Sequence, residues 1–287
     1  MLILNIFVSA FCFFCSLDVS VGNLDYRTLE TKDLASVNRF SYQVGLFAKL
    51  CDQSFLWCGG SLIAKNWVLS AAHCGDGISP SIPLRVDSVQ VYLGATNIAS
   101  GEVTYNVSKA NIIIHPDWDA ENMLNDVALI KTPSVPFSAK IKPVRLPQLA
   151  SSYSTYAGEY VIASGWGRKN ESVPHLVQDL HWRNMKVINN FECFKTFTLI
   201  SSRDLCASTL SSSSVCMGDS GGPLVLKSSG VQIGLSSFGV ADSCRPEEPS
   251  GFMRLTSYLE WIKSHTDFCD SKEHMRSIFS SSNTRTI

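Results

Sequence analysis

Short runs of β-branched and aromatic residues, separated by glycine, proline, asparagine and serine, follow one another along most of the chain after residue 22. Helical periodicity is scarce until the C-terminal end. Runs of about four to eight such residues between turn residues are typical of strands in an all-β protein. We therefore expect strands at Tyr42–Leu46, Ser61–Ala64, Trp67–Ser70, Val89–Leu93, Val127–Lys131, Tyr160–Gly165, Pro223–Leu226 and Gln232–Ser236.

A proline-flanked stretch, Lys142–Pro147, divides this pattern into two halves of similar size. A polar segment, Ser151–Tyr156, follows it. Each half carries several predicted strands, so we interpret the stretch as a crossing between two β units.

The C-terminal end changes character. Ser257 and Glu260 have the spacing of a capping box ahead of Trp261, which predicts a short terminal helix. From Thr266 onward the residues are mostly polar, and we expect an exposed tail over residues 266–287.

The N-terminus carries an almost continuous apolar run, Leu2–Leu17, followed by Asp18 and by small residues at positions 20 and 22. This is the pattern of a signal peptide over residues 1–22. An uncleaved signal anchor is the alternative, but the run is shorter than the roughly 20 apolar residues that a membrane span needs. A short propeptide would then occupy residues 23–28.

Composition excludes several classes of protein. Of 287 residues, 45% are hydrophobic and only 17% are charged, and 24 Lys and Arg residues balance 25 Asp and Glu residues. This balance argues against a nucleic-acid partner and against a disordered polyelectrolyte. There is no second long apolar run, so we expect no membrane association after signal removal.

Ten cysteines are many for a cytosolic protein and favour an oxidising compartment. Cys12 and Cys15 lie inside the apolar N-terminal run, which leaves eight in the mature chain. Asn106 and Asn170 begin acceptor patterns for glycosylation, and their occupancy stays open. We expect a secreted, extracellular protein.

The most specific segment for chemistry is Cys216–Leu224, in which Ser220 is preceded by Asp219 and surrounded by three glycines. Glycines permit close backbone approach and unusual dihedral angles, so the amides of Gly218 and Ser220 can point at a developing oxyanion. A serine hydroxyl is a poor nucleophile alone and needs a base within hydrogen-bond reach.

Two further residues supply that base and its orienting acid. Among six histidines, His73 stands at a predicted strand end, before Cys74 and after small residues that would fix its ring. A lone histidine is more often structural than catalytic, and Asp126 alone could simply begin a strand. Together with Ser220 they match a nucleophile, a base and an orienting acid.

Chain order distinguishes two known arrangements. Residues 218–222 also fit the Gly-x-Ser-x-Gly elbow of α/β-hydrolases, but there the histidine follows the serine and the acid. The order His73, Asp126, Ser220 instead resembles the chymotrypsin-like serine endopeptidases of the trypsin family, from about Phe40 to His265. The resemblance implies two six-stranded antiparallel β-barrels and a short C-terminal helix. The protease domain would span 29–265, with barrels at about 29–147 and 148–265.

Other blocks carry the same resemblance: Trp57–Ile63, Ala71–Cys74, Ser164–Gly167 and Phe252–Ile262. It implies three disulfides, namely Cys58–Cys74, Cys193–Cys206 and Cys216–Cys244. Cys51 and Cys269 are unmatched, and whether they pair is left open because a disulfide requires α-carbons within about 7 Å.

The resemblance also implies a mechanism and partners. Ser220 would attack a peptide carbonyl, His73 would transfer the proton, and Asp126 would hold the His73 tautomer. No metal or organic cofactor is implied. The partners would be protein or peptide substrates, an activating protease and protein inhibitors, and the protein would act as a monomer.

Residues of the primary specificity pocket follow from the same comparison. Ser214 takes the position at the pocket base where a trypsin-like enzyme carries Asp, which argues against cleavage after Arg or Lys. Ser237, Phe238 and Gly239 would form one wall, and Ser250 another. We expect a chymotrypsin-like or elastase-like preference for apolar side chains.

The chain departs from the family at its activation motif. The family's new N-terminus begins Ile-Val-Gly-Gly and pairs with the acid before the nucleophile, here Asp219. This chain has Leu29–Lys32 at that place, and the nearest upstream basic residue is Arg27. Burial of an unpaired Glu30 carboxylate would be costly. The alternative function is therefore a catalytically silent homologue that acts as a binding or regulatory protein.

Overall fold

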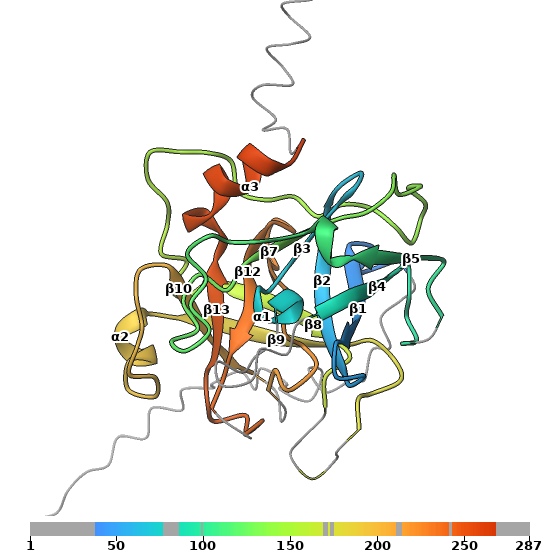
Figure 1. The fold of residues 1–287 in the computed structure, drawn as a ribbon. Helices are drawn as coiled ribbons and strands as arrows, with labels where there is room; N and C mark the ends of the chain where they lie inside the picture. The colour runs from blue at the N-terminus through green and yellow to red at the C-terminus, as the bar shows by residue number, and fades with distance from the viewer. Residues whose placement is uncertain are drawn as a thin grey trace, which may run out of the picture. The chain divides into compact units, whose positions relative to one another are not determined.

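The structure is a computed structural model that describes residues 38–76, 86–98, 100–168, 172, 175–210, 214–240 and 243–267. The predicted signal peptide, the propeptide, Leu29–Lys32, Asn170, Cys269 and the tail after residue 267 lie outside the described residues. Figure 1 shows the chain, which is mostly β-structure with a few short helices. The predicted all-β fold class is confirmed.

The first half of the chain forms one antiparallel sheet with the strand order β5-β4-β1-β2-β3-β7-β6. Its strands are β1 (Gln43–Leu50), β2 (Phe55–Ala64), β3 (Trp67–Ser70), β4 (Val86–Leu93), β5 (Val103–Ser108), β6 (Ile112–Ile114) and β7 (Ala128–Lys131). It has seven strands where six were expected, because the 3-10 turn η2 (Lys109–Asn111) separates β5 from β6, and the two pair with different neighbours.

The second half closes into a six-stranded antiparallel barrel in the order β10-β13-β12-β11-β8-β9. Its strands are β8 (Tyr160–Gly165), β9 (His181–Ile188), β10 (Asp204–Thr209), β11 (Pro223–Leu226), β12 (Gln232–Phe238) and β13 (Ser250–Arg254). Val161, Met185, Leu205, Leu224 and Phe252 are buried inside it and form a hydrophobic cluster.

The remaining elements are short: α1 (His73–Asp76), α2 (Asn190–Cys193), η3 (Leu255–Ser257) and α3 (Leu259–His265). The predicted terminal helix is present, but the capping box is wrong. Ser257 ends η3, Tyr258 takes the N-cap position of α3, and no side chain caps this helix. Of the described residues, no helix is long and apolar enough to span a bilayer.

Predicted and observed strands agree where apolar runs are continuous. The bounds of β3, β8 and β11 match the prediction, and β1, β2, β4, β7 and β12 overlap it. The sequence pattern missed β5, β6, β9, β10 and β13. In β9 and β10, charged or small polar residues interrupt the apolar pattern, and pairing with neighbouring strands decides their conformation.

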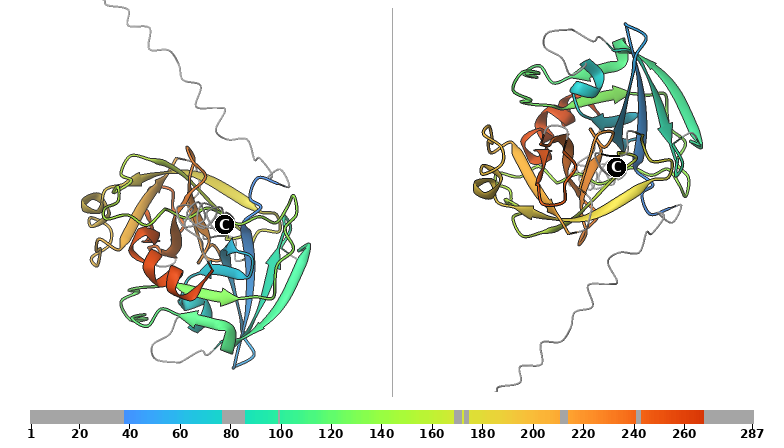
Figure 2. Two further views of the ribbon diagram at one scale, coloured as in Figure 1. Left: turned by 90° about the horizontal axis from the view of Figure 1, so that it is seen from above. Right: turned by 90° about the horizontal axis from the view of Figure 1, so that it is seen from below.

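The two halves meet along one shared hydrophobic cluster. It contains Val44 and Leu62 from the first sheet, Leu235 and Met253 from the barrel, and Ile262 from α3. Figure 2 shows the blue-to-green sheet beside the yellow-to-red barrel in both views. The first residue of α1, His73, follows β3 closely in the chain and is linked through Asp126, before β7, to Ser237 of β12.

Candidate active site

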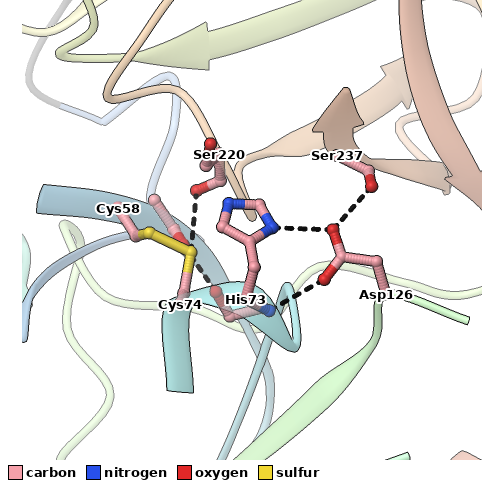
Figure 3. The surroundings of a disulfide bond; sticks show 8 residues. Cys58, His73, Cys74, Asp126, Ser220 and Ser237 are labelled. Carbon is pink, nitrogen blue, oxygen red and sulfur yellow. Dashed lines mark hydrogen bonds and ion pairs between the residues drawn. A yellow bond between two sulfur atoms is a disulfide. The ribbon is translucent and has the colours of Figure 1, made fainter. Parts of the chain in front are cut away.

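His73 is the first residue of α1, directly after β3 and the buried pair Ala71 and Ala72. Its side chain is only 3% exposed. The Cys58–Cys74 disulfide joins β2 to α1 beside it, as Figure 3 shows. Small buried neighbours and this covalent bond fix the backbone that carries the imidazole.

Asp126 lies in the turn before β7 and is fully buried. Its Oδ2 is 2.7 Å from His73 Nδ1, and its Oδ1 accepts a hydrogen bond from the His73 amide at 2.9 Å. The Ser237 hydroxyl donates to Oδ2 at 2.5 Å (Figure 3). Because a carboxylate only accepts, Nδ1 carries the ring proton and Nε2 is left as an acceptor. The carboxylate therefore holds the imidazole in one tautomer and one orientation.

Asn125 sets the direction of the chain into Asp126. Its backbone is in the left-handed region with a φ of 55°, which asparagine tolerates better than most residues. The side-chain Nδ2 of Asn125 donates to the Asp117 carbonyl at 2.8 Å, and its Oδ1 accepts from the Arg203 guanidinium at 2.7 Å. Sequence reasoning missed Asn125, although an asparagine before the acid is the type of residue that such a turn favours.

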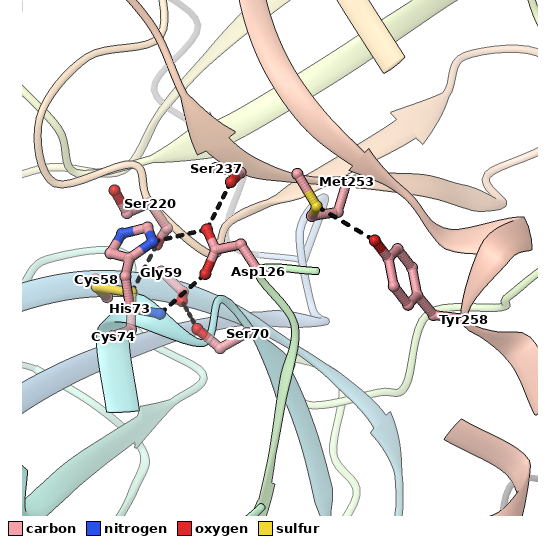
Figure 4. A network of polar contacts seen from close by, with 10 residues as sticks. All are labelled: Cys58, Gly59, Ser70, His73, Cys74, Asp126, Ser220, Ser237, Met253 and Tyr258. Carbon is pink, nitrogen blue, oxygen red and sulfur yellow. Dashed lines mark hydrogen bonds and ion pairs between the residues drawn. A yellow bond between two sulfur atoms is a disulfide. The ribbon is translucent and has the colours of Figure 1, made fainter. Parts of the chain in front are cut away.

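Ser220 comes from the second half of the chain and lies beside the His73 ring in Figures 3 and 4. Its carbonyl accepts a hydrogen bond from the Gly59 amide of β2 at 2.7 Å, which connects the loop that carries Ser220 to the first sheet. Among the described residues, no hydrogen bond joins the Ser220 hydroxyl to His73. Such bonds are often long in the absence of substrate and shorten during reaction.

Gly221 lets the loop that carries Ser220 approach β2 and β3 closely. Gly221 has a φ of 76°, and a Cβ there would collide with the Ser70 hydroxyl and the Gly59 carbonyl. The Ser70 hydroxyl itself donates to that carbonyl at 2.8 Å, as Figure 4 shows. A glycine directly after Ser220 is therefore required where the loop lies against the first sheet.

The amides of Gly218 and Ser220 are the predicted oxyanion donors. Neither donates a hydrogen bond within the described part of the chain. Gly218 has a φ of 98°, and a Cβ at this position would collide with Leu176. Glycine is therefore required where the loop presents these amides.

Asp219 belongs to the same loop, directly before Ser220, and is 4% exposed. Its Oδ1 accepts from the Gly167 amide at 2.9 Å, and its Oδ2 accepts from the Cys216 amide at 3.1 Å. Burial raises the pKa of this carboxyl group above its usual value, and the charge of Arg183 and the two amide hydrogen bonds act in the opposite direction. The Asp219 carboxylate thus joins the loop to Gly167 and to Cys216 through accepted hydrogen bonds.

A pocket of about 130 Å³ opens next to Ser220. Ser237, Phe238, Gly239 and Ser250, which the sequence predicts as its walls, all line it. Ser214 is buried and is not among the residues that line this pocket, and its hydroxyl is 3.1 Å from that of Ser250. The structure therefore brings four of the five predicted pocket residues to one pocket, and the fifth contacts one of them.

The potential metal ligands do not form a thiolate site. Among the described residues, the grouped donor atoms belong to Cys58, His73 and Cys74. Both sulfurs are joined in a disulfide and do not offer thiolates to a metal. Cys193–Cys206 and Cys216–Cys244 are also disulfides, so the three pairs are those that the resemblance implies. Cys51 is exposed, and whether it pairs with Cys269, which lies outside the described residues, stays open.

The chain is similar to a family of known proteins over most of its length. A family model described as trypsin matches residues 32–262. Collagenase of Hypoderma lineatum is 38% identical over 230 residues, which cover 79% of this chain and 83% of that protein. Chymotrypsin of Phaedon cochleariae is 36% identical and covers 79% of this chain and 78% of its own length.

Solved structures show the same likeness in three dimensions. A structure of HL collagenase superposes with a TM-score of 0.69 at 36% identity and covers 80% of this chain and 94% of that one. Neuropsin, a serine protease of mouse brain, gives a TM-score of 0.66 at 29% identity. The match covers 80% of this chain and 96% of the neuropsin chain.

Proposed function

The chain belongs to the trypsin family of serine-type endopeptidases, and we propose on that basis that it cleaves peptide bonds by acyl transfer with Ser220 as nucleophile. His73 is the general base and Asp126 orients it. The observation that carries this assignment is the buried pair of Asp126 and His73, with Ser220 beside the ring.

The geometry supports each proton transfer. Nε2 of His73 accepts the Ser220 proton as the hydroxyl attacks the carbonyl, and the resulting imidazolium is stabilised by Asp126. His73 then protonates the leaving amine, and water releases the acyl group by the same route. The two unoccupied amides of Gly218 and Ser220 supply donors for the oxyanion of the tetrahedral intermediate.

Family membership implies protein or peptide substrates. We propose that the protein is secreted after removal of a signal peptide and acts as a monomer. An activating protease that cleaves near Arg27 and protein inhibitors are its further partners.

The first test is covalent labelling of Ser220 by a fluorophosphonate probe on the secreted protein. We expect labelling, because the probe needs the same activated hydroxyl and oxyanion donors as a peptide substrate. Samples before and after limited trypsin treatment show whether cleavage near Leu29 is required. Ser220→Ala is the blank.

Absence of labelling in both samples would contradict the proposal and favour the silent homologue. Labelling only after trypsin would show a zymogen in spite of the altered activation segment. Labelling in both samples would show a site that is assembled without cleavage.

Specificity follows from the chemistry of the pocket. The hydroxyls of Ser214 and Ser250 share one hydrogen bond, and the described residues that line the pocket include no carboxylate to pair with Arg or Lys. We propose a preference for apolar side chains before the cleaved bond.

A panel of peptides that differ at this residue tests the preference. Phe, Tyr or Leu should exceed Arg by about tenfold or more in kcat/KM, because pocket contacts discriminate on this scale. A clear preference for Arg would overturn the assignment of the pocket.

A further inference from the structure

Asp219 is a buried carboxylate with two amide donors, and no salt bridge joins it to a described residue. An ionised carboxylate in a low-dielectric interior is unfavourable unless positive charge stabilises it. A cation in the interior of the barrel would stabilise the Asp219 carboxylate.

The register of β8 and β9 places a cationic side chain near Asp219. A side chain at Gly165 of β8 would point directly at the Asp219 carboxylate. Ala163, two residues earlier on β8, lies on the same face of the sheet, and its cross-strand partner on β9 is Arg183. Gly165 itself pairs with His181. The side chains of Arg183 and His181 therefore leave β9 on the face that carries Asp219.

This face is the inside of the barrel. Met185 and Val187, which follow Arg183 at alternate positions, are buried in the hydrophobic cluster, whereas Lys186 between them is exposed. Arg183 is 7% exposed. A guanidinium stays charged in proteins, so Arg183 brings a positive charge into the interior of the barrel.

The electrostatics agree with this placement. The charges of Arg183 and, more weakly, His181 lower the pKa of Asp219, against the effect of its burial. Gly165 of β8 contributes no charge, and Gly167, two residues later, contributes an amide hydrogen bond. Interactions between charges are weakly screened in such an interior.

We propose that Arg183 is the internal cation that stabilises Asp219 and thereby holds the loop Cys216–Ser220 in the arrangement that presents the amides of Gly218 and Ser220. Arg183 is a positioning residue that acts through Asp219. The inference rests on the proposed function of this loop. It places one positive charge near Asp219 in the intact chain, without cleavage at the N-terminus.

The test compares Arg183→Met with Arg183→Lys and with the matched control Lys186→Met, which removes a cation from the outer face of the same strand. The measurements are the rate of labelling by a fluorophosphonate and kcat/KM for a peptide substrate, with thermal unfolding in parallel. We expect Arg183→Met to slow both rates about 10- to 100-fold, less than the about 100- to 1,000-fold that follows outright loss of one oxyanion donor. Arg183→Lys should restore most of this loss, and Lys186→Met should change neither rate.

Wild-type protein that fails to label would contradict the proposed function itself. Active wild type with an equally active Arg183→Met variant would overturn only the role of Arg183. Equal losses in the Met and Lys variants would also overturn it, since charge would then not matter. If Arg183→Met does not accumulate as folded protein, Arg183→Gln, which keeps hydrogen-bond donors without charge, is measured instead against the same outcomes.

Discussion

Replacing Ser220 by alanine should reduce kcat about a million-fold, to the low residual rate supplied by binding and the oxyanion donors. The backbone of the loop should be unaffected, because the Ser220 contacts to the first sheet use its carbonyl and not its hydroxyl. The measurement is hydrolysis of a peptide substrate under saturating conditions, with the unfolding temperature as a check on folding.

A second substitution shows whether Ser220 acts with His73. When two residues act as one unit, removing either one removes their joint contribution to kcat. The double variant Ser220→Ala with His73→Ala should therefore have a kcat only slightly below that of either single variant. Residual hydrolysis above about a thousandth of the wild-type rate in Ser220→Ala would mean that another group is the nucleophile.

Asp126→Asn should lower kcat about 10,000-fold while the fold is preserved, as the same change does in an enzyme with this arrangement. The asparagine amide can donate to His73 Nδ1, which would place the ring proton on Nε2 and leave no acceptor for the Ser220 proton. The Ser237 hydroxyl, which donates to Asp126 Oδ2, can instead accept a hydrogen bond from the asparagine amide at that position. The loss should therefore appear mainly in kcat and much less in KM.

Asp117→Asn is the matched control, since Asp117 is an exposed carboxylate nine residues earlier and only its backbone carbonyl contacts Asn125. Its activity should equal that of the wild type. An Asp126→Asn enzyme within tenfold of the wild type would show that the buried carboxylate does not control the His73 tautomer.

The agreement between sequence and structure is uneven for physical reasons. Strands with continuous apolar runs, such as β3 and β11, could be located from the sequence because both of their faces are buried. β9 and β13 could not, because Arg183 in the one and Ser250 in the other are polar residues buried by the closure of the barrel. The capping box failed since a 3-10 turn already includes Ser257.

The candidate site shows the same division. His73, Asp126 and Ser220 each lie in a short sequence motif, and the residues next to each in the chain decide its local backbone geometry. The sequence by itself therefore determined the candidate residues and the family that they resemble. Only the tertiary structure decided that Ser237, 111 residues from Asp126, donates to it, and that Asp219 faces the side of the barrel from which Arg183 projects. Such contacts join segments far apart in the chain, and their partners are set by strand register and barrel closure, which no local pattern encodes.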